Sequence, residues 1–141
     1  MRDKDLLLGI DIGTTGTKCS VYDFRGIRVA SAYREYPMIH PRPGWTEQDP
    51  YRWWDTVCCN LQTIFKSQNI DKNRIAAVGT SSTNAVVLVD RQGQPVCNAI
   101  SLHDQRSGHQ VEWLKENIGE ERIRGVAANR IANGSFCLPA L

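Results

Sequence analysis

The sequence predicts a mixed α/β domain, and three observations support this. Short apolar runs bounded by turn residues indicate strands, a stretch after residue 50 has the spacing of an amphipathic helix, and that helix lies between strands, which favours parallel pairing across it. The chain has 141 residues, of which 41% are hydrophobic and 23% are charged, as in folded globular proteins. Its length suits one domain of ordinary size.

Three strands are predicted first along the chain. Leu6–Ile10 is a short apolar run that ends at Asp11, Thr17–Asp23 alternates in polarity, and Arg28–Tyr36 follows a tight turn at Arg25 and Gly26. Strands that follow one another through tight turns predict an antiparallel meander.

The helix is predicted to begin at Pro50 with Asp49 as its cap, and to end near Gln68 and Asn69. Its core-facing residues have the spacing i, i+3, i+4, i+7. They are Trp54, Val57, Cys58, Leu61, Ile64 and Phe65.

The second half of the chain predicts further strands and two helices. A buried strand at Ile75–Gly79 is followed by a polar stretch, Thr80–Asn84. The later predicted elements are a strand at Ala85–Val89, a hairpin turn at Asp90–Gly93, a strand at Pro95–Ile100, a helix from Asp104 to Gly119 that buries Val111, Leu114 and Ile118, and a short helix at Glu120–Ala128.

Composition excludes several classes of function. A net charge of +2 and an isoelectric point near 8.3, spread evenly along the chain, argue against binding to nucleic acid or to an anionic membrane. No apolar run approaches the ~20 residues that span a bilayer, and no signal-peptide cleavage site is evident, so a cytoplasmic location is expected. The cysteines, which form no CxxC pair and are expected to be reduced thiols, are Cys19, Cys58, Cys59, Cys97 and Cys137.

The strongest chemical signal is the segment Gly9–Lys18. Asp11 ends a strand, the turn Gly13–Gly16 contains two glycines and two threonines, and Lys18 follows. Glycines let backbone N–H groups approach an anion, and hydroxyls donate further hydrogen bonds to phosphate oxygens. Asp11 fits such a site when Mg²⁺ lies between carboxylate and phosphate, while Lys18 offsets phosphate charge. The alternative is a glycine–threonine hairpin with an aspartate beside its turn. The spacing is not that of a Walker A loop.

The same segment, Asp-x-Gly-Thr-Thr-x-x-Lys, resembles the first phosphate loop of the actin/hexokinase-like ATPases. Three further segments resemble the FGGY family of carbohydrate kinases, and they are Pro43–Pro50, Ile75–Gly79 and Asp90–Arg106. These motifs cover nearly the whole chain. The resemblance implies a ribonuclease H-like N-terminal domain, paired with a second domain across a cleft where ATP and a sugar or polyol meet.

The resemblance also assigns roles to individual residues. It places Asp11 at the metal, Mg²⁺, and it places Gly13, Thr14, Thr15 and Lys18 near the transferred phosphate of ATP. Asp104 and Arg106 fall where the family lines its sugar pocket, although an aspartate that begins a helix is often only an N-cap. We predict that the pocket is lined by Thr83, Asn84, Asp104 and Arg106.

Two departures from the family pattern concern the substrate. Thr83-Asn84 stands where glycerol kinases carry Arg-Glu and xylulokinases carry Met-His, and Leu102 replaces a tryptophan. The missing clamp and aromatic wall argue against glycerol and weaken the case for xylulose. Hydroxyl and amide groups can still bind sugar hydroxyls, so the sugar stays open.

Family members continue well beyond this length. Residues 1–141 are therefore expected to be the N-terminal part of the first domain, without the second, and to be inactive alone because the general base and the adenine site lie in later segments. The alternative is a non-catalytic remnant that binds phosphate or sugar, or that complements a partner chain. A small-molecule sugar or polyol is the expected ligand, and a homo-oligomer is possible.

Overall fold

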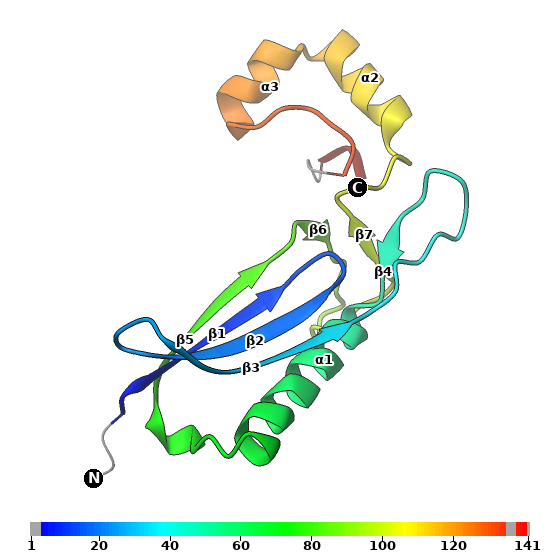
Figure 1. Ribbon diagram of the computed structural model, residues 1–141. Helices are drawn as coiled ribbons and strands as arrows, with labels where there is room; N and C mark the ends of the chain where they lie inside the picture. Colours follow the sequence, from blue (N-terminus) through cyan, green and yellow to red (C-terminus); the bar gives the residue numbers. More distant parts are fainter. Residues whose placement is uncertain (1–3, 135–137, 141) are drawn as a thin grey trace. The chain divides into compact units, whose positions relative to one another are not determined.

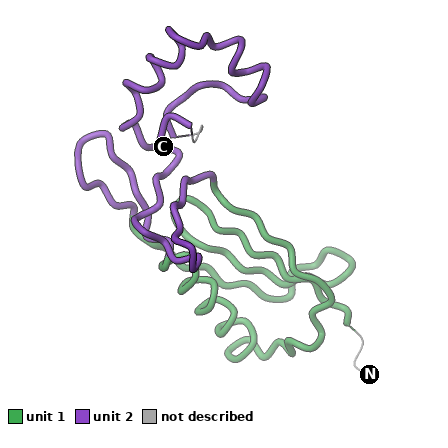
Figure 2. Tube along the Cα trace, turned by 180° about the vertical axis from the view of Figure 1, so that it is seen from behind, with its two compact units in different colours: residues 1–37, 51–83 green, residues 38–50, 84–141 purple. Residues whose placement is uncertain are grey.

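The computed structural model describes residues 4–134 and 138–140 and confirms a mixed α/β architecture. The chain divides into two compact units (Figure 2). Unit 1 comprises residues 1–37 and 51–83, and unit 2 comprises residues 38–50 and 84–141. Each unit is built around its own small sheet, and the two are described separately below.

Unit 1 contains a four-stranded sheet in the order β3-β2-β1-β5 (Figure 1). The strands β1, β2 and β3 form the predicted antiparallel meander, and β1 pairs in parallel with β5, as predicted for strands on either side of the helix. The four strands are β1 (Leu6–Ile12), β2 (Gly16–Asp23), β3 (Arg28–Glu35) and β5 (Ile75–Ser82).

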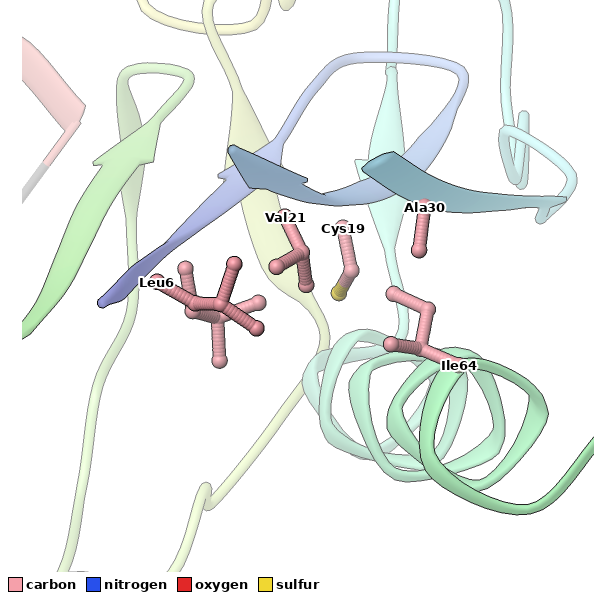
Figure 3. Close-up of a cluster of buried hydrophobic side chains, with 6 residues drawn as sticks. Leu6, Cys19, Val21, Ala30 and Ile64 are labelled. Carbon is pink, nitrogen blue, oxygen red and sulfur yellow. The ribbon is translucent and has the colours of Figure 1, made fainter. Parts of the chain in front are cut away.

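One face of this sheet packs against α1 (Pro50–Gln62) and the single π-helical turn that continues it (Thr63–Ser67). Alternation along the strands sends one set of side chains into this core (Figure 3), namely Leu6, Leu8, Cys19, Val21 and Ala30, which cluster with Ile64. The predicted helical stripe is confirmed at Val57 and Ile64, which are buried. It is wrong at Trp54, which is 68% exposed.

The strand β5 is longer than predicted. Thr80–Ser82, expected to be a polar connection, continues the strand, because β1 extends to Ile12 and offers its backbone as a partner as far as Ser82. The length of β5 is therefore set by backbone pairing with β1. Polar side chains do not prevent this pairing, because this part of β5 is exposed. A short 3₁₀ turn, Lys72–Arg74, precedes this strand.

Unit 2 contains a small sheet in the order β4-β7-β6, formed by β4 (Glu47–Gln48), β6 (Ala85–Val86) and β7 (Ala99–Ser101). The predicted turn Asp90–Gly93 is present, since the N–H of Gly93 donates to the carbonyl of Asp90 at 3.0 Å. The strands predicted on either side of it are shorter than expected. Pro95 has no N–H for a ladder, and only an isolated bridge joins it to Val89.

The helices of unit 2 are α2 (Gly108–Asn117) and α3 (Glu120–Ala127), with a 3₁₀ turn at Leu138–Ala140. Val111, Leu114, Ile123 and Ile131 form their core. Ile118, predicted to join it, lies at the end of α2 and is 39% exposed. Gly119 ends the helix as predicted, with φ +90°.

Other sequence predictions concern cysteines and membranes. Cys19, Cys58, Cys59 and Cys97 are free thiols, and Cys137 lies outside the described residues. Among the residues that the structure describes, no helix combines the length and apolarity needed to cross a bilayer.

Candidate active site

The turn Gly13–Gly16 joins β1 to β2 and is closed by a hydrogen bond from the N–H of Gly13 to the carbonyl of Gly16, at 2.9 Å. Gly16 has no room for a side chain. A Cβ there would lie 2.5 Å from the carbonyl oxygen of Arg34 and 2.6 Å from the hydroxyl of Tyr33. The glycine at position 16 is therefore required by close packing against β3, a constraint that the sequence motif alone did not reveal.

Asp11 and Lys18 lie on the face of the sheet opposite α1. They are directly opposite each other on β1 and β2, so their side chains share one face. On the same line across the sheet, Asp11 is paired with Ser81 of β5 and Lys18 is paired with Tyr33 of β3. We call Ser81, Asp11, Lys18 and Tyr33 the polar row. It brings a carboxylate, an ammonium group and two hydroxyls to the strand ends beside the turn.

A hollow of about 370 Å³ lies on this face, next to Asp11 and Lys18. Two glycines on adjacent strands, Gly9 and Gly79, form part of its lining. A Cβ at Gly79 would meet no atom within 4 Å, and one at Gly9 would meet only the carbonyl oxygen of Ser20, at 3.9 Å. The absence of side chains at these two positions leaves space beside the Asp11 carboxylate for atoms of a ligand.

The turn is held from two sides. Directly after β3, the hydroxyl of Tyr36 donates to the carbonyl of Gly13, and the N–H of Tyr36 donates to the carbonyl of Thr15 at 3.2 Å. Directly after β5, the hydroxyl of Thr83 lies 3.2 Å from that of Thr14, and the N–H of Thr83 donates to the carbonyl of Ile12 at 2.8 Å. Thr83, predicted in the sugar pocket, therefore contacts the phosphate-loop candidate directly.

A buried polar group lies under the start of β2. Asn60 of α1 is fully buried, and its amide donates to the carbonyl of Thr17 at 2.9 Å, while Thr56 donates to the hydroxyl of Thr17 at 2.9 Å. Burial raises the pKa of the Cys19 thiol, and the side chain of Asn60 partly offsets this. Sequence reasoning missed this group, although Thr56 and Asn60 are spaced i, i+4 beside the predicted core stripe.

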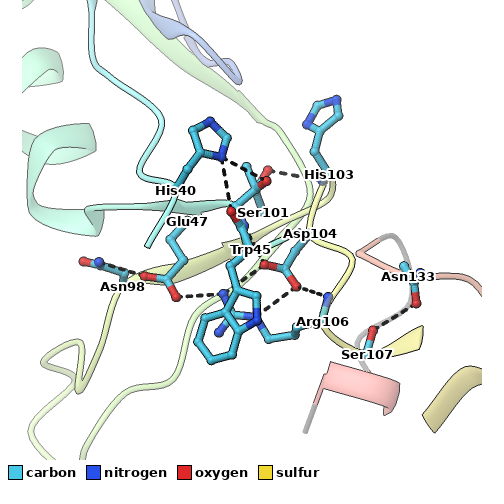
Figure 4. Close-up of polar contacts among 11 residues, drawn as sticks. His40, Trp45, Glu47, Asn98, Ser101, His103, Asp104, Arg106, Ser107 and Asn133 are labelled. Carbon is cyan, nitrogen blue, oxygen red and sulfur yellow. Dashed lines mark hydrogen bonds and ion pairs between the residues drawn. The ribbon is translucent and has the colours of Figure 1, made fainter. Parts of the chain in front are cut away.

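Unit 2 holds a second polar cluster around Arg106 (Figure 4), which we call the Arg106 cluster: Trp45, Glu47, Asp104 and Arg106. The guanidinium group of Arg106 lies 3.8 Å from the centre of the Trp45 ring, and it is paired with Glu47 at 2.7 Å and Asp104 at 2.9 Å. These contacts join the segment at residues 45–47 to the segment that follows β7.

Asp104 is only 1% exposed, and its carboxylate is fully engaged within the protein. One oxygen accepts the N–H of Thr46 at 2.7 Å, and the other accepts the N–H of Arg106 at 2.8 Å. Burial acts to raise the pKa of Asp104, but the hydrogen bonds from Arg106 and from these backbone groups outweigh it and lower the pKa. The alternative that Asp104 is an N-cap is wrong, since α2 begins only at Gly108 with Ser107 before it.

The structure thus gathers Asp11, the turn Gly13–Gly16, Lys18 and Thr83 in unit 1. Asn84, Asp104 and Arg106 belong to unit 2, and their joint participation with Thr83 in a sugar pocket stays a prediction. No group of three His, Cys, Asp or Glu side chains gathers in the described part of the chain.

Comparison with known proteins shows the family to which the chain belongs. The family model described as "FGGY family of carbohydrate kinases, N-terminal domain" matches residues 6–136. The glycerol kinase of Haloferax volcanii is 38% identical over 117 residues, which are 82% of this chain and 23% of the relative. The chain thus spans about a quarter of the length of such curated relatives.

Solved structures with similar folds include two sugar kinases. The xylulose kinase of Rhodospirillum rubrum is 27% identical with a TM-score of 0.84, over 92% of this chain and 27% of that one. The gluconate kinase of Lactobacillus acidophilus is 30% identical with a TM-score of 0.76, over 85% of this chain and 24% of that one. From the match of the family model to nearly all of its residues, the chain belongs to the FGGY family of carbohydrate kinases and carries the family's N-terminal sequence.

Proposed function

We propose that this chain provides the phosphate- and metal-facing wall of an ATP-dependent kinase that phosphorylates a hydroxyl of a sugar or sugar-derived polyol. The observation that carries the proposal is the pairing of Asp11 with Lys18 on the open face of the sheet, beside the turn Gly13–Gly16 and the hollow lined by Gly9 and Gly79. Opposite charges at the edge of a hollow suit a ligand that combines a cation with phosphate oxygens.

The residues present fit Mg²⁺. Asp11 supplies a hard oxygen ligand, Ser81 lies opposite it on β5, and the hollow leaves room for water molecules and phosphate oxygens. When bound, the ion would neutralise charge on the phosphate groups. Lys18 would add a second positive charge from the neighbouring strand, and Thr14 and Thr15 would offer hydroxyls and backbone N–H groups to phosphate oxygens.

Catalysis of phosphoryl transfer depends mainly on positioning and electrostatic stabilisation. In this proposal, residues 1–141 are the N-terminal part of the first domain, and the general base, the adenine site and the opposing wall come from a second domain or a complementing chain. On the sugar side we assign Thr83, Asn84, Asp104 and Arg106. Because the carboxylate of Asp104 is occupied internally, its role there would be to position Arg106 rather than to bind sugar itself.

The named relatives act on different substrates, as glycerol, xylulose and gluconate kinases. These names share a polyhydroxylated small molecule, which is the substrate class proposed here. The individual sugar stays open, and the departures at Thr83, Asn84 and Leu102 argue against glycerol and weaken the case for xylulose.

The test is binding of MgADP to the 141-residue chain, measured by titration calorimetry and by amide chemical shifts. Because the adenine site is assigned to later segments, MgADP should bind weakly, through its metal and phosphates alone. Asp11→Asn should weaken this binding at least severalfold while the rest of the spectrum is preserved, because the variant loses the charge that holds the metal. Asp55→Asn, an exposed position on α1, is the matched control and should bind as the wild type does.

In a complete kinase that contains this segment, Asp11→Asn should lower turnover about 10²–10³-fold. Equal MgADP affinity and equal turnover in the Asp11 variant and the wild type would exclude the metal assignment. Binding that is unchanged when Mg²⁺ is omitted would contradict it as well.

A further inference from the structure

We propose that Tyr36 is a positioning residue for phosphate binding, whose hydroxyl holds the carbonyl of Gly13 and so aims the backbone N–H of Thr14 at the bound phosphate. The proposal rests on the proposed function, because it concerns the same turn. Tyr36 directly follows β3 and is 7% exposed. The motif Asp-x-Gly-Thr-Thr-x-x-Lys does not include this tyrosine.

The geometry of the peptide unit carries the argument. The carbonyl of Gly13 and the N–H of Thr14 belong to one peptide group, and none of the described peptide bonds is cis. In a planar trans peptide the carbonyl and the N–H point in opposite directions. A hydrogen bond from the buried Tyr36 hydroxyl to the carbonyl of Gly13 therefore turns the N–H of Thr14 away from the tyrosine.

A second contact from the same residue strengthens the constraint. The N–H of Tyr36 donates to the carbonyl of Thr15 at 3.2 Å, so one residue contacts two of the carbonyls within a four-residue turn. The Thr14 side chain is held separately by the hydroxyl of Thr83, at 3.2 Å. What Tyr36 adds is control over the orientation of the backbone, which is the part of a phosphate loop that donates to the anion.

The tyrosine is also suited to remain a donor. Burial raises the pKa of Tyr36, and the nearby charges of Tyr33 and Asp11 act in the same direction, while a hydrogen bond with Thr17 opposes them. The hydroxyl therefore stays protonated throughout the neutral range. The loop carbonyl of Gly13 consequently keeps its partner under the conditions in which a kinase works.

The experiment compares wild type with Tyr36→Phe, which keeps the ring and removes only the hydroxyl, in the isotope-labelled 141-residue chain. The carbonyl ¹³C shift of Gly13 and the amide shift of Thr14 should differ between the two free proteins. With MgADP as the probe, the amide of Thr14 should move strongly in the wild type, and the affinity of Tyr36→Phe should fall about two- to tenfold, the effect of one net hydrogen bond. Tyr51→Phe on α1, an exposed tyrosine, should leave both unchanged.

The possible outcomes separate this proposal from the proposed function. If MgADP shifts Asp11 and Lys18 but leaves the amide of Thr14 in place, or if Tyr36→Phe binds as tightly as the wild type, the role of Tyr36 is overturned while the phosphate site stands. If no signal moves in the wild type, the proposed function fails and the role of Tyr36 falls with it. If Tyr36→Phe does not fold, the wild type still tests the premise, because a Thr14 amide that MgADP leaves unshifted while Asp11 and Lys18 respond overturns the role of Tyr36.

Discussion

Replacing Asp104 with asparagine isolates what the Arg106 cluster contributes to unit 2. Each oxygen of the Asp104 carboxylate accepts two hydrogen bonds. One accepts from the backbone N–H and Nε of Arg106, and the other accepts from the N–H of Thr46 and a terminal nitrogen of Arg106. Whichever way the asparagine amide is turned, its NH₂ group faces two of these four donors. The shape of the side chain is conserved, so the change tests the charge and the acceptors alone.

The expected loss of stability follows from these contacts. A hydrogen bond to a charged group contributes about 1.5–3 kcal/mol, and breaking a buried ion pair costs about 3–5 kcal/mol. Arg106 keeps its pairing with Glu47 at 2.7 Å, which limits the damage. We expect Asp104→Asn to lower the free energy of unfolding of unit 2 by about 3 kcal/mol, or the melting temperature by about 10 °C in a chain of this size.

The assay is thermal unfolding at pH 7, together with hydrogen exchange at the N–H of Thr46, which should speed up in the variant. Since the pKa of Asp104 is lowered by folding from its usual 3.8, its contribution is present above that value and is lost as pH falls through the folded pKa. The difference in free energy of unfolding between wild type and variant should therefore shrink below about pH 4.

The control variant is Asp90→Asn, in the exposed turn of the same unit, which should lower the free energy of unfolding by less than about 1 kcal/mol. Equal stability and equal exchange at Thr46 would refute this account of the cluster.

Two further predictions concern glycines of unit 1. Gly16→Ala should lower the free energy of unfolding in urea by about 1–3 kcal/mol, because its Cβ would lie 2.5 Å from the carbonyl oxygen of Arg34. Gly79→Ala is the control and should cost less than about 1 kcal/mol, because there is open space at its Cβ. Gly79→Val should also fold, but it should weaken MgADP binding severalfold in calorimetry, since the valine would project into the hollow beside Asp11. Unchanged affinity in that variant would mean that phosphate does not use the hollow.

The elements of unit 1 were predictable because local pattern and tertiary partner agree there. The apolar run of β1 and the alternation of β2 each need only one buried face, and the turn residues between them fix the pairing. The prediction errors lie in segments whose secondary structure is set by residues distant in the sequence. Thr80–Ser82 is strand because β1 continues beside it, and the helix expected from Asp104 begins at Gly108 because the Asp104 carboxylate binds Thr46 and Arg106.

The residues of the candidate site likewise fall into those that the sequence indicated and those that it did not. Asp11, Gly13 and Lys18 could be proposed as site residues from the sequence because they are contiguous, as a phosphate loop requires. Tyr36, Ser81 and Asn60 could not, because a tyrosine after a strand, a serine near a strand end and an asparagine on a helix are each compatible with many structures. Their relevance arises from register and from hydrogen bonds to backbone carbonyls of the turn or of β2, which no spacing rule encodes.

The position of the site residues is held mainly by the core. Leu6 and Leu8 are buried against α1, and the alternation that buries them places Asp11 on the open face, opposite Lys18. A slip of one residue between β1 and β2 would expose these leucines and turn Asp11 toward the core. Each buried leucine contributes about 1.5–3 kcal/mol, and an unpaired buried carboxylate would cost several more. An exposed pair such as Asp11 and Lys18 contributes about 1 kcal/mol or less. The geometry of the candidate active site is therefore enforced by hydrophobic burial on the opposite face, which leaves Asp11 and Lys18 free to interact with a ligand.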